Sequence, residues 1–228
     1  MIKHISFDLW LTLIRSHPDF KKRRAEFLCS EYNPLDYSVS SIMEVVQTTD
    51  MVSDRLNEIT GHKVPTELMY RRILVKLGYD PTSISDDLIH LIKLKVNRLF
   101  MNYPPPLLNE SILPILRYLK NEGYTLNISS NTGYIEGSTM ETTLKNIGIS
   151  EFFDFCIFSD QIGLSKPSVD FYDKVLERAG CKKDEILHIG DNYKADYLGA
   201  MNFGFKALHI NNQQYTLNDI TRHLQKND

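Results

Sequence analysis

The N-terminal part of the chain carries a short stretch suited to nucleophilic chemistry. Asp8-Leu9-Trp10-Leu11-Thr12 directly follows the apolar run Ile5-Ser6-Phe7, which is predicted to end a first β-strand. A carboxylate at the C-terminal tip of a buried strand lies where open α/β sheets bind their ligands. It can act as a nucleophile in group transfer if its charge is neutralised and the substrate is held in line. Because a large indole stands at Trp10, the stretch offers this one carboxylate and no second acid beside it.

Two further stretches could hold an anion. The segment Ser130-Asn131-Thr132-Gly133 follows a predicted strand, Tyr124 to Ser129, and small hydroxyls and backbone N–H groups entering a helix can bind anions. The stretch Gly163 to Pro167 contains Lys166, whose ammonium could neutralise a developing phosphoryl charge. Taken singly, each has a simpler explanation, because such residues are common in turns and most lysines lie at the surface.

The strongest chemical signal is the stretch Ile186 to Asp196. A predicted strand, Glu185 to Ile189, ends in Gly190-Asp191, and the second acid, Asp196, follows at the start of a helix. Two acids near one strand tip suit a divalent cation, because Mg²⁺ prefers hard oxygen ligands. Helix capping by Asp191 or Asn192 is the alternative, but it explains one acid and not the whole set.

The composition is that of an ordinary globular protein. The chain has 228 residues, of which 42% are hydrophobic and 24% charged, and its net charge is −3. There is no electrostatic case for binding nucleic acid, and no apolar run approaches the roughly 20 residues that span a bilayer. The first residues lack a secretory pattern, and the three cysteines suggest neither a disulfide framework nor a zinc site. We therefore expect a reduced, cytoplasmic protein without membrane or nucleic-acid partners; its oligomeric state stays open.

The residues from about Ser16 to Tyr103 show helical periodicity and few strand signals, and four helices are expected there. Their predicted starts are Pro18-Asp19, Ser40 or Ser41 as N-cap, Pro65, and Ser85-Asp86-Asp87. The predicted apolar face of the second helix consists of Ile42, Val45, Val46 and Val52. Four helices joined by short loops predict an antiparallel bundle.

The proline run in Tyr103 to Pro106 ends this pattern, because consecutive prolines cannot continue a helix. Helices and strands then alternate up to Ile210, which predicts a parallel sheet with right-handed crossovers. The later elements are predicted at Ser111–Asn121, Tyr124–Ser129, Met140–Ile147, Phe155–Ser159, Ser168–Ala179, Glu185–Ile189, Tyr193–Phe203 and Lys206–Ile210. Since the first strand, Ile2 to Phe7, needs a sheet to join, we predict an α/β core from residues 1–15 and 105–228. Residues 16–104 are then an inserted helical lid.

In this order and at these strand ends, the residues resemble the four motifs of the haloacid dehalogenase-like hydrolase superfamily. The matching positions are Asp8 with Thr12, Ser130, Lys166 in a Gly-x-x-Lys-Pro setting, and Gly190-Asp191 with Asp196. The resemblance spans the chain, because residues 16–104 look like the family's helical cap. It implies a Rossmann-like parallel sheet wrapped by helices and an all-α cap. We expect this cap to move about hinges near Arg15 and Pro104 to Pro106.

The chain departs from the family pattern at Trp10. Phosphatases of this family usually carry Asp-x-Asp, whose second acid protonates the leaving group and then activates water. The family's dehalogenase branch also lacks that acid, but it does not use magnesium and lacks the Gly-Asp that is present here as Gly190-Asp191. Metal-assisted phosphoryl chemistry is therefore favoured. General acid–base catalysis is worth about 10²- to 10⁴-fold, so poor alkoxide leaving groups should depart slowly unless a cap residue or the substrate supplies the proton.

The resemblance implies a phosphohydrolase of a small phosphorylated metabolite, with an aspartyl-phosphate formed on Asp8. Mg²⁺ would be held by Asp8, Asp191 and the backbone carbonyl of Trp10, whose indole would lie against the substrate. The phosphoryl oxygens would be held by Ser130, Asn131 and Lys166, while Asp196 would orient Lys166 or a metal-bound water and Thr12 completes the first motif. The alternatives are a metal-free hydrolase of the haloacid dehalogenase type and a phosphate-binding or interaction module with little activity.

Three other groups of polar residues receive no role in the predicted site. Lys21-Lys22-Arg23-Arg24 is predicted to form a solvated helix face, and Arg71-Arg72 to lie away from the substrate. His188 lies inside a predicted strand, so it is expected to be packed rather than catalytic.

Overall fold

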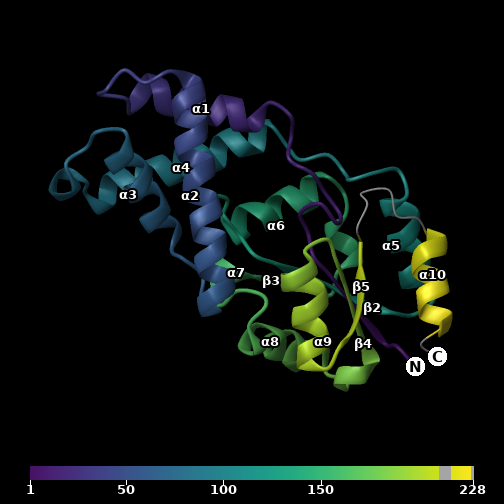
Figure 1. Cartoon of the computed structure of the whole chain (residues 1–228). Coiled ribbons are helices and arrows are strands. Elements are labelled where there is room, and N and C mark those ends of the chain that lie inside the picture. The colour runs from purple at the N-terminus through teal and green to yellow at the C-terminus, as the bar shows by residue number, and fades with distance from the viewer. Residues whose placement is uncertain (211–216, 227–228) are drawn as a thin grey trace.

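The computed structural model describes residues 1–210 and 217–226, and its centre is a parallel β-sheet (Figure 1). The five strands are β1 (His4–Phe7), β2 (Thr125–Ser130), β3 (Phe155–Phe158), β4 (Ile186–Gly190) and β5 (Lys206–His209). Their order is β3-β2-β1-β4-β5, and every neighbouring pair is parallel. The predicted α/β core is therefore confirmed, and the first strand takes the central place in the sheet.

Helices cover both faces of this sheet. One face carries α5 (Ile112–Asn121), α6 (Gly137–Asn146) and α10 (Leu217–Lys226), whose buried side chains belong to one apolar cluster. The other face carries α8 (Val169–Ala179) and α9 (Gly199–Phe203), which share a second cluster. Figure 1 shows α5 beside α10, and α8 and α9 on the far side of the strands. The last helix, α10, was not among the predicted elements.

Four helices that lie between β1 and β2 in the sequence form a separate group. This group is here called the helical insert. They are α1 (Phe20–Glu31), α2 (Val39–Thr60), α3 (Thr66–Lys76) and α4 (Asp86–Asn102). Contacts join α1 to α2 and α4, and α3 to α2 and α4, so the four helices pack as one unit. The two connections to the core lie side by side, since the Arg15 N–H donates to the Pro106 carbonyl at 3.1 Å.

Several predicted helix boundaries differ from the structure; α6, for example, begins at Gly137 and not at Met140. Ser38, not Ser40 or Ser41, caps α2, because its extended backbone lets its Oγ accept from the Ser41 N–H at 3.1 Å. The predicted helix Tyr193–Phe203 is two pieces, a π-helical turn η4 (Tyr193–Leu198) and then α9. The buried face of α2 also differs from the predicted one, because Val45 and Val52 are only half-buried. The residues of α2 that are buried are Ile42, Val46, Thr49, Ser53 and Asn57.

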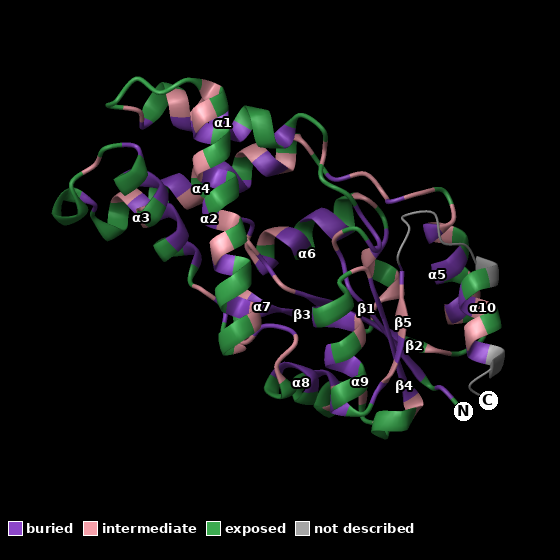
Figure 2. Cartoon of the chain, in the orientation of Figure 1, coloured by how far each residue is buried: buried purple, intermediate pink, exposed green. Residues whose placement is uncertain are grey.

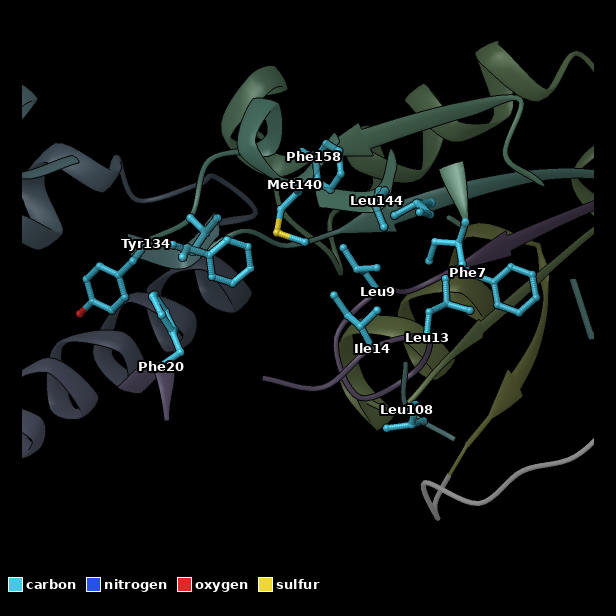
Figure 3. Packing of buried hydrophobic residues seen from close by; sticks show 14 of the residues in the cluster. Phe7, Leu9, Leu13, Ile14, Phe20, Leu108, Tyr134, Met140, Leu144 and Phe158 are labelled. Atoms are coloured by element: carbon cyan, nitrogen blue, oxygen red, sulfur yellow. The ribbon is translucent and has the colours of Figure 1, made fainter. Parts of the chain in front are cut away.

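The apolar core continues from the sheet into the helical insert. Figure 2 shows buried residues along the strands and on the inner sides of the surrounding helices. Figure 3 follows one cluster from Phe7 and Leu9, at the end of β1, to Phe20 and Tyr134 at the boundary with the helical insert. Each fully buried side chain of this size contributes about 1.5–3 kcal/mol. Among the described helices, none combines the length and the apolar character that crossing a membrane requires.

Candidate active site

The register of the three central strands brings the predicted motifs to one edge of the sheet. Phe7 at the end of β1 pairs with Ile128 of β2 and Ile189 of β4. The next residue, Asp8, donates its N–H to the Ile189 carbonyl at 2.8 Å. Since β2 ends at Ser130 and Asp191 directly follows β4, these residues all lie at the carboxyl ends of adjacent strands, where such sheets bind ligands.

The loop after Asp8 turns back sharply. Leu13 and Ile14 both donate their N–H groups to the Leu9 carbonyl, at 2.9 and 3.1 Å, and Leu11 takes a left-handed conformation with φ 58°. A non-glycine residue in this region costs of order 1–3 kcal/mol and is enriched at functional sites. Thr12 is fully buried within this loop. Trp10 is half-buried and packs its ring edge-to-face on Phe100 of α4, with centroids 6.3 Å apart, so it faces the helical insert.

Lys166 is a buried lysine, 1% exposed, and not the surface lysine of the simpler explanation. Its Nζ donates to Asp8 Oδ1 at 2.8 Å, to Asp196 Oδ1 at 2.6 Å and to the Ser129 carbonyl at 2.7 Å. All three N–H donors of the ammonium are therefore used. The carboxylates of Asp8 and Asp196 raise its pKa, so the lysine stays charged between them.

Asn131 fixes the main chain of this lysine. Its Oδ1 accepts from the Lys166 N–H at 2.8 Å, and its Nδ2 donates to the Lys166 carbonyl at 3.0 Å. The amide side chain is thus engaged with the lysine loop, so its predicted contact with phosphate stays a prediction. Ser130 lies buried at the end of β2, where its Oγ donates to the Asn131 carbonyl at 3.3 Å.

Asp196 is the most heavily bonded carboxylate of the site. Besides Lys166, its Oδ1 accepts from His188 Nε2 at 3.2 Å, and its Oδ2 accepts from the Asn192 N–H at 3.0 Å. The Lys166 ammonium and the His188 hydrogen bond lower the pKa of Asp196 against the effect of its burial. It sits in the π-helical turn η4, a type of distortion frequent at functional sites. This geometry is consistent with the predicted role of orienting Lys166.

A glycine makes room for that carboxylate. A Cβ placed on Gly190 would lie 2.4 Å from the Asp196 carboxyl carbon. We expect Gly190→Ala to destabilise the protein by about 1–3 kcal/mol through overpacking, measured by urea denaturation. A loss of less than about 1 kcal/mol for Gly190→Ala would contradict overpacking by the new Cβ.

A row of buried polar side chains supports Asp196 from within the sheet. His188 Nδ1 lies 3.0 Å from Ser6 Oγ, which lies 3.0 Å from Ser129 Oγ, and Asn127 Nδ2 donates to Ser129 Oγ at 2.8 Å. Burial lowers the pKa of His188, which favours the neutral ring. His188 is therefore packed, as predicted, but its hydrogen bond to Asp196 was not foreseen.

Three carboxylates at the site fit a divalent cation. One oxygen each of Asp8, Asp191 and Asp196 can be chosen so that all lie within 4.8 Å of one another. Burial raises the pKa of Asp8 to about 7, against the lowering effect of Lys166, and raises the pKa of Asp191 to about 6. A hard cation would relieve both penalties. Since Asp196 already accepts three hydrogen bonds, Asp8 and Asp191 are the carboxylates that could hold it.

The site opens into a cavity of about 510 Å³ between the core and the helical insert. The core side is lined by Asp8, Trp10, Asn131, Gly133, Tyr134, Lys166 and Asp191, among others. The side of the helical insert is lined by Phe20, Lys21, Arg24, Asp50, Asp54, Glu58 and Phe100. The prediction that Lys21 to Arg24 form a solvated face was therefore wrong for Arg24, which is buried because its guanidinium packs on Phe20 and Tyr134. Arg71 behaves as expected and donates to the Ile84 carbonyl within the helical insert.

Sequence reasoning missed the acidic wall of this cavity. Asp50, Asp54 and Glu58 follow one another at four-residue intervals, which places them on one face of α2. That spacing is visible in the sequence, whereas the contact of this face with the core is not. Asp50 comes close to the core, since its Oδ1 lies 3.1 Å from where a Cβ on Gly133 would be.

The sequence is similar to those of known proteins. A family model described as haloacid dehalogenase-like hydrolase matches residues 36–210. The chain is 28% identical over 218 residues to a glyceraldehyde 3-phosphate phosphatase of Methanocaldococcus jannaschii, covering 94% of this chain and 87% of that protein. It is 32% identical over 141 residues to a glyceraldehyde 3-phosphate phosphatase of Methanothermobacter thermautotrophicus, covering 60% of this chain but only 55% of that protein.

The fold is also found among solved structures. A HAD hydrolase of Bacillus subtilis, whose structure bound to magnesium reveals interdomain movement, superimposes with a TM-score of 0.72 at 20% identity. The alignment covers 99% of this chain and all of that one, so the sheet and the helical insert are both shared.

Proposed function

We propose, from the premise that the chain belongs to the haloacid dehalogenase-like hydrolase family, that it is a magnesium-dependent phosphohydrolase. Its substrate would be a small phosphorylated metabolite, and Asp8 would carry an aspartyl-phosphate intermediate. The observation that supports this most is the buried Lys166 ammonium between Asp8 and Asp196, with Asp191 beside them. A fixed cation next to a strand-tip carboxylate favours attack on an anionic group.

The metal would be held by Asp8, Asp191 and the backbone carbonyl of Trp10. When bound, Mg²⁺ would screen the repulsion between the Asp8 carboxylate and the phosphate. The indole at Trp10 does not interfere with this role, because the proposed ligand is a main-chain atom.

The chain's own residues would then perform the transfer. Asp8 would attack phosphorus in line, while Ser130 and free N–H groups of the loop after β2 hold the non-bridging oxygens and the Lys166 ammonium neutralises their charge. Asp196 would hold the lysine in place through its 2.6 Å hydrogen bond. Water would then hydrolyse the phosphorylated Asp8 and release phosphate.

The helical insert would act as a cap, with residues 16–104 as the cap and residues 1–15 and 105–228 as the core. Residues 211–216 and 227–228 of that range lie outside the described part. Closure would exclude water from the site. The adjoining connections at Arg15 and Pro106 would serve as the hinge, and interdomain movement in the similar Bacillus subtilis structure supports this role. A cavity of about 510 Å³ suits a small ligand, in keeping with relatives named for glyceraldehyde 3-phosphate.

A substrate screen tests the proposed function. We expect phosphate release from one or more small phosphorylated metabolites in Mg²⁺, and none when the metal is chelated. A parallel arm with short 2-haloacids measures halide release. Halide release without metal, together with no phosphate release, would overturn the proposal in favour of a dehalogenase.

Metal binding should also appear as a pH-dependent gain in stability. The pKa values of about 7 for Asp8 and about 6 for Asp191 lie above the ordinary 3.8. The folded protein therefore holds more protons than the unfolded chain between about pH 4 and 7, so without metal its stability falls as pH rises through this window.

Mg²⁺ should reverse this loss, because it replaces those protons. At a hundredfold excess over Kd it should add about 2.7 kcal/mol, seen as a rise in Tm at pH 8 and a much smaller one at pH 5. Asp191→Asn should lose most of the shift. Equal shifts at both pH values, or an unchanged shift in Asp191→Asn, would contradict the assignment.

A further inference from the structure

The departing oxygen of a phosphate ester needs a proton that Trp10 cannot supply. In an in-line displacement that oxygen leaves on the side of phosphorus opposite the attacking Asp8, which in this fold is the side of the helical insert. We propose that Asp50 of α2 is the general acid that protonates this oxygen. The inference rests on the proposed phosphohydrolase function and assigns it a catalytic residue on the helical insert.

The first support is the way α2 is held over the site. Near its middle, the Val46 carbonyl accepts from the Tyr134 hydroxyl at 2.9 Å. Just beyond its C-terminal end, the Gly61 carbonyl accepts from the Ser165 N–H at 2.8 Å, one residue before Lys166. The helix therefore spans the two core loops that would hold the phosphoryl group, and the face carrying Asp50 lines the cavity between them.

The second support is the approach of Asp50 to the loop after β2. Its Oδ1 lies 3.1 Å from the position of a Cβ on Gly133, three residues beyond Ser130. The absence of a side chain at Gly133 lets the carboxyl approach this loop closely. Asp54 lines the same cavity one turn farther along α2, but it is exposed, whereas Asp50 is half-buried.

The third support is a cation beside Asp50. Arg24 is 9% exposed and lines the cavity, where its guanidinium packs on Phe20 and Tyr134. Its positive charge acts on Asp50. An alcohol leaving group with its own oxygens, placed between Arg24 and Asp50, would be attracted by the guanidinium charge and take a proton from Asp50.

The charges around Asp50 suit a group that gains and loses a proton. Its burial raises its pKa, while the cations facing it lower the pKa and stabilise the carboxylate after proton transfer. The cations are Lys21 and Arg24 on α1 and Lys63 after α2. On α2, Asp54 lies one turn from Asp50, and Glu58 lies one turn beyond Asp54. Tyr70 and Tyr134 face Asp50 as neutral phenols. Opposing influences of this kind are typical of acid–base residues.

The Asp8 carboxylate forms a bond to phosphorus, the bond from phosphorus to the alcohol oxygen breaks, and the Asp50 carboxyl proton moves to that oxygen. In the second half, the Asp50 carboxylate takes a proton from water as the water oxygen bonds to phosphorus. The bond from phosphorus to Asp8 then breaks, which restores both groups and releases phosphate.

The test compares leaving groups in Mg²⁺-loaded variants. We expect Asp50→Asn to lose about 10²- to 10⁴-fold in kcat/KM for alkyl phosphates such as glycerol phosphate. It should lose less than about tenfold for para-nitrophenyl phosphate, whose phenolate leaves without a proton. Across a series of phosphate esters, the rate should therefore depend more steeply on leaving-group pKa in Asp50→Asn than in wild type. Asp54→Asn, a matched acid one turn away, should keep the wild-type dependence.

Two results would overturn the assignment while leaving the phosphohydrolase function standing. One is an equal loss for alkyl and aryl esters in Asp50→Asn; the other is a steepened dependence in Asp54→Asn alone. Absence of hydrolysis of every ester by the wild type in Mg²⁺ would instead overturn the proposed function, and the role of Asp50 with it.

Discussion

Replacing Asp8 by asparagine should abolish phosphate ester hydrolysis, with a loss on the order of 10⁴-fold or more, as for the loss of other nucleophiles. The amide cannot form the acyl phosphate, and it also removes a proposed metal ligand. The fold should survive, because asparagine has the same shape and the buried carboxylate is costly. The raised pKa of Asp8, about 7, means that at pH 8 the metal-free variant should be at least as stable as the wild type. Steady-state kinetics and thermal melting measure the two effects.

The matched control is Asp170→Asn, which changes an exposed acid in the first turn of α8. It should leave both activity and Tm near the wild-type values. Activity of Asp8→Asn within tenfold of wild type would remove Asp8 as the nucleophile, whatever the other site residues do.

The second large effect is expected for Lys166→Met, this time on stability. The substitution leaves Asp8 and Asp196 buried without the ammonium that lies 2.8 and 2.6 Å from them. Removing one partner of a buried ionic network costs about 3–5 kcal/mol, and kcat should fall with it. Urea denaturation at pH 7.5 measures the loss of unfolding free energy. Below about pH 6 the penalty should shrink, because a protonated Asp8 no longer needs the cation.

Lys174→Met serves as control for that measurement. Lys174 pairs with Glu177 at 2.8 Å, but both side chains are about half exposed or more, at 48% and 65%. A surface pair of this kind contributes about 0–1 kcal/mol. If the two lysine variants lost equal stability, the buried network would not be the source of the effect.

The sequence predicted the site best for residues that directly follow a β-strand. Asp8 and Asp191 each directly follow a short apolar strand, and that local pattern suffices to predict both their position and their mutual proximity in a parallel sheet. Lys166 was found by its order among the motifs, although a lysine taken alone would be expected at the surface. The inserted position of the four helices likewise followed from the proline run at Pro104 to Pro106.

What escaped prediction depends on contacts between distant segments. The two hydrogen bonds from the Asn131 side chain to the Lys166 main chain join residues 35 positions apart. No local pattern distinguishes this asparagine from one in an ordinary turn. The burial of Arg24 depends on Tyr134, far along the chain, which offers its ring to the guanidinium at 4.5 Å. The acids of α2 could be placed on one helix face from their spacing, but not directed toward the core. That direction comes from how α2 docks, which only the folded structure reveals.

The most direct test of the account is rapid-quench mass spectrometry of the enzyme during turnover of an aryl phosphate in Mg²⁺. Acid quenching preserves acyl phosphates, and peptide analysis locates the phosphoryl group. We predict one phosphoryl group on the peptide that contains Asp8, formed within the first turnover and absent from Asp8→Asn. A wild-type enzyme that releases phosphate while Asp8 stays unmodified throughout, or that carries the label on another residue, would contradict the central claim.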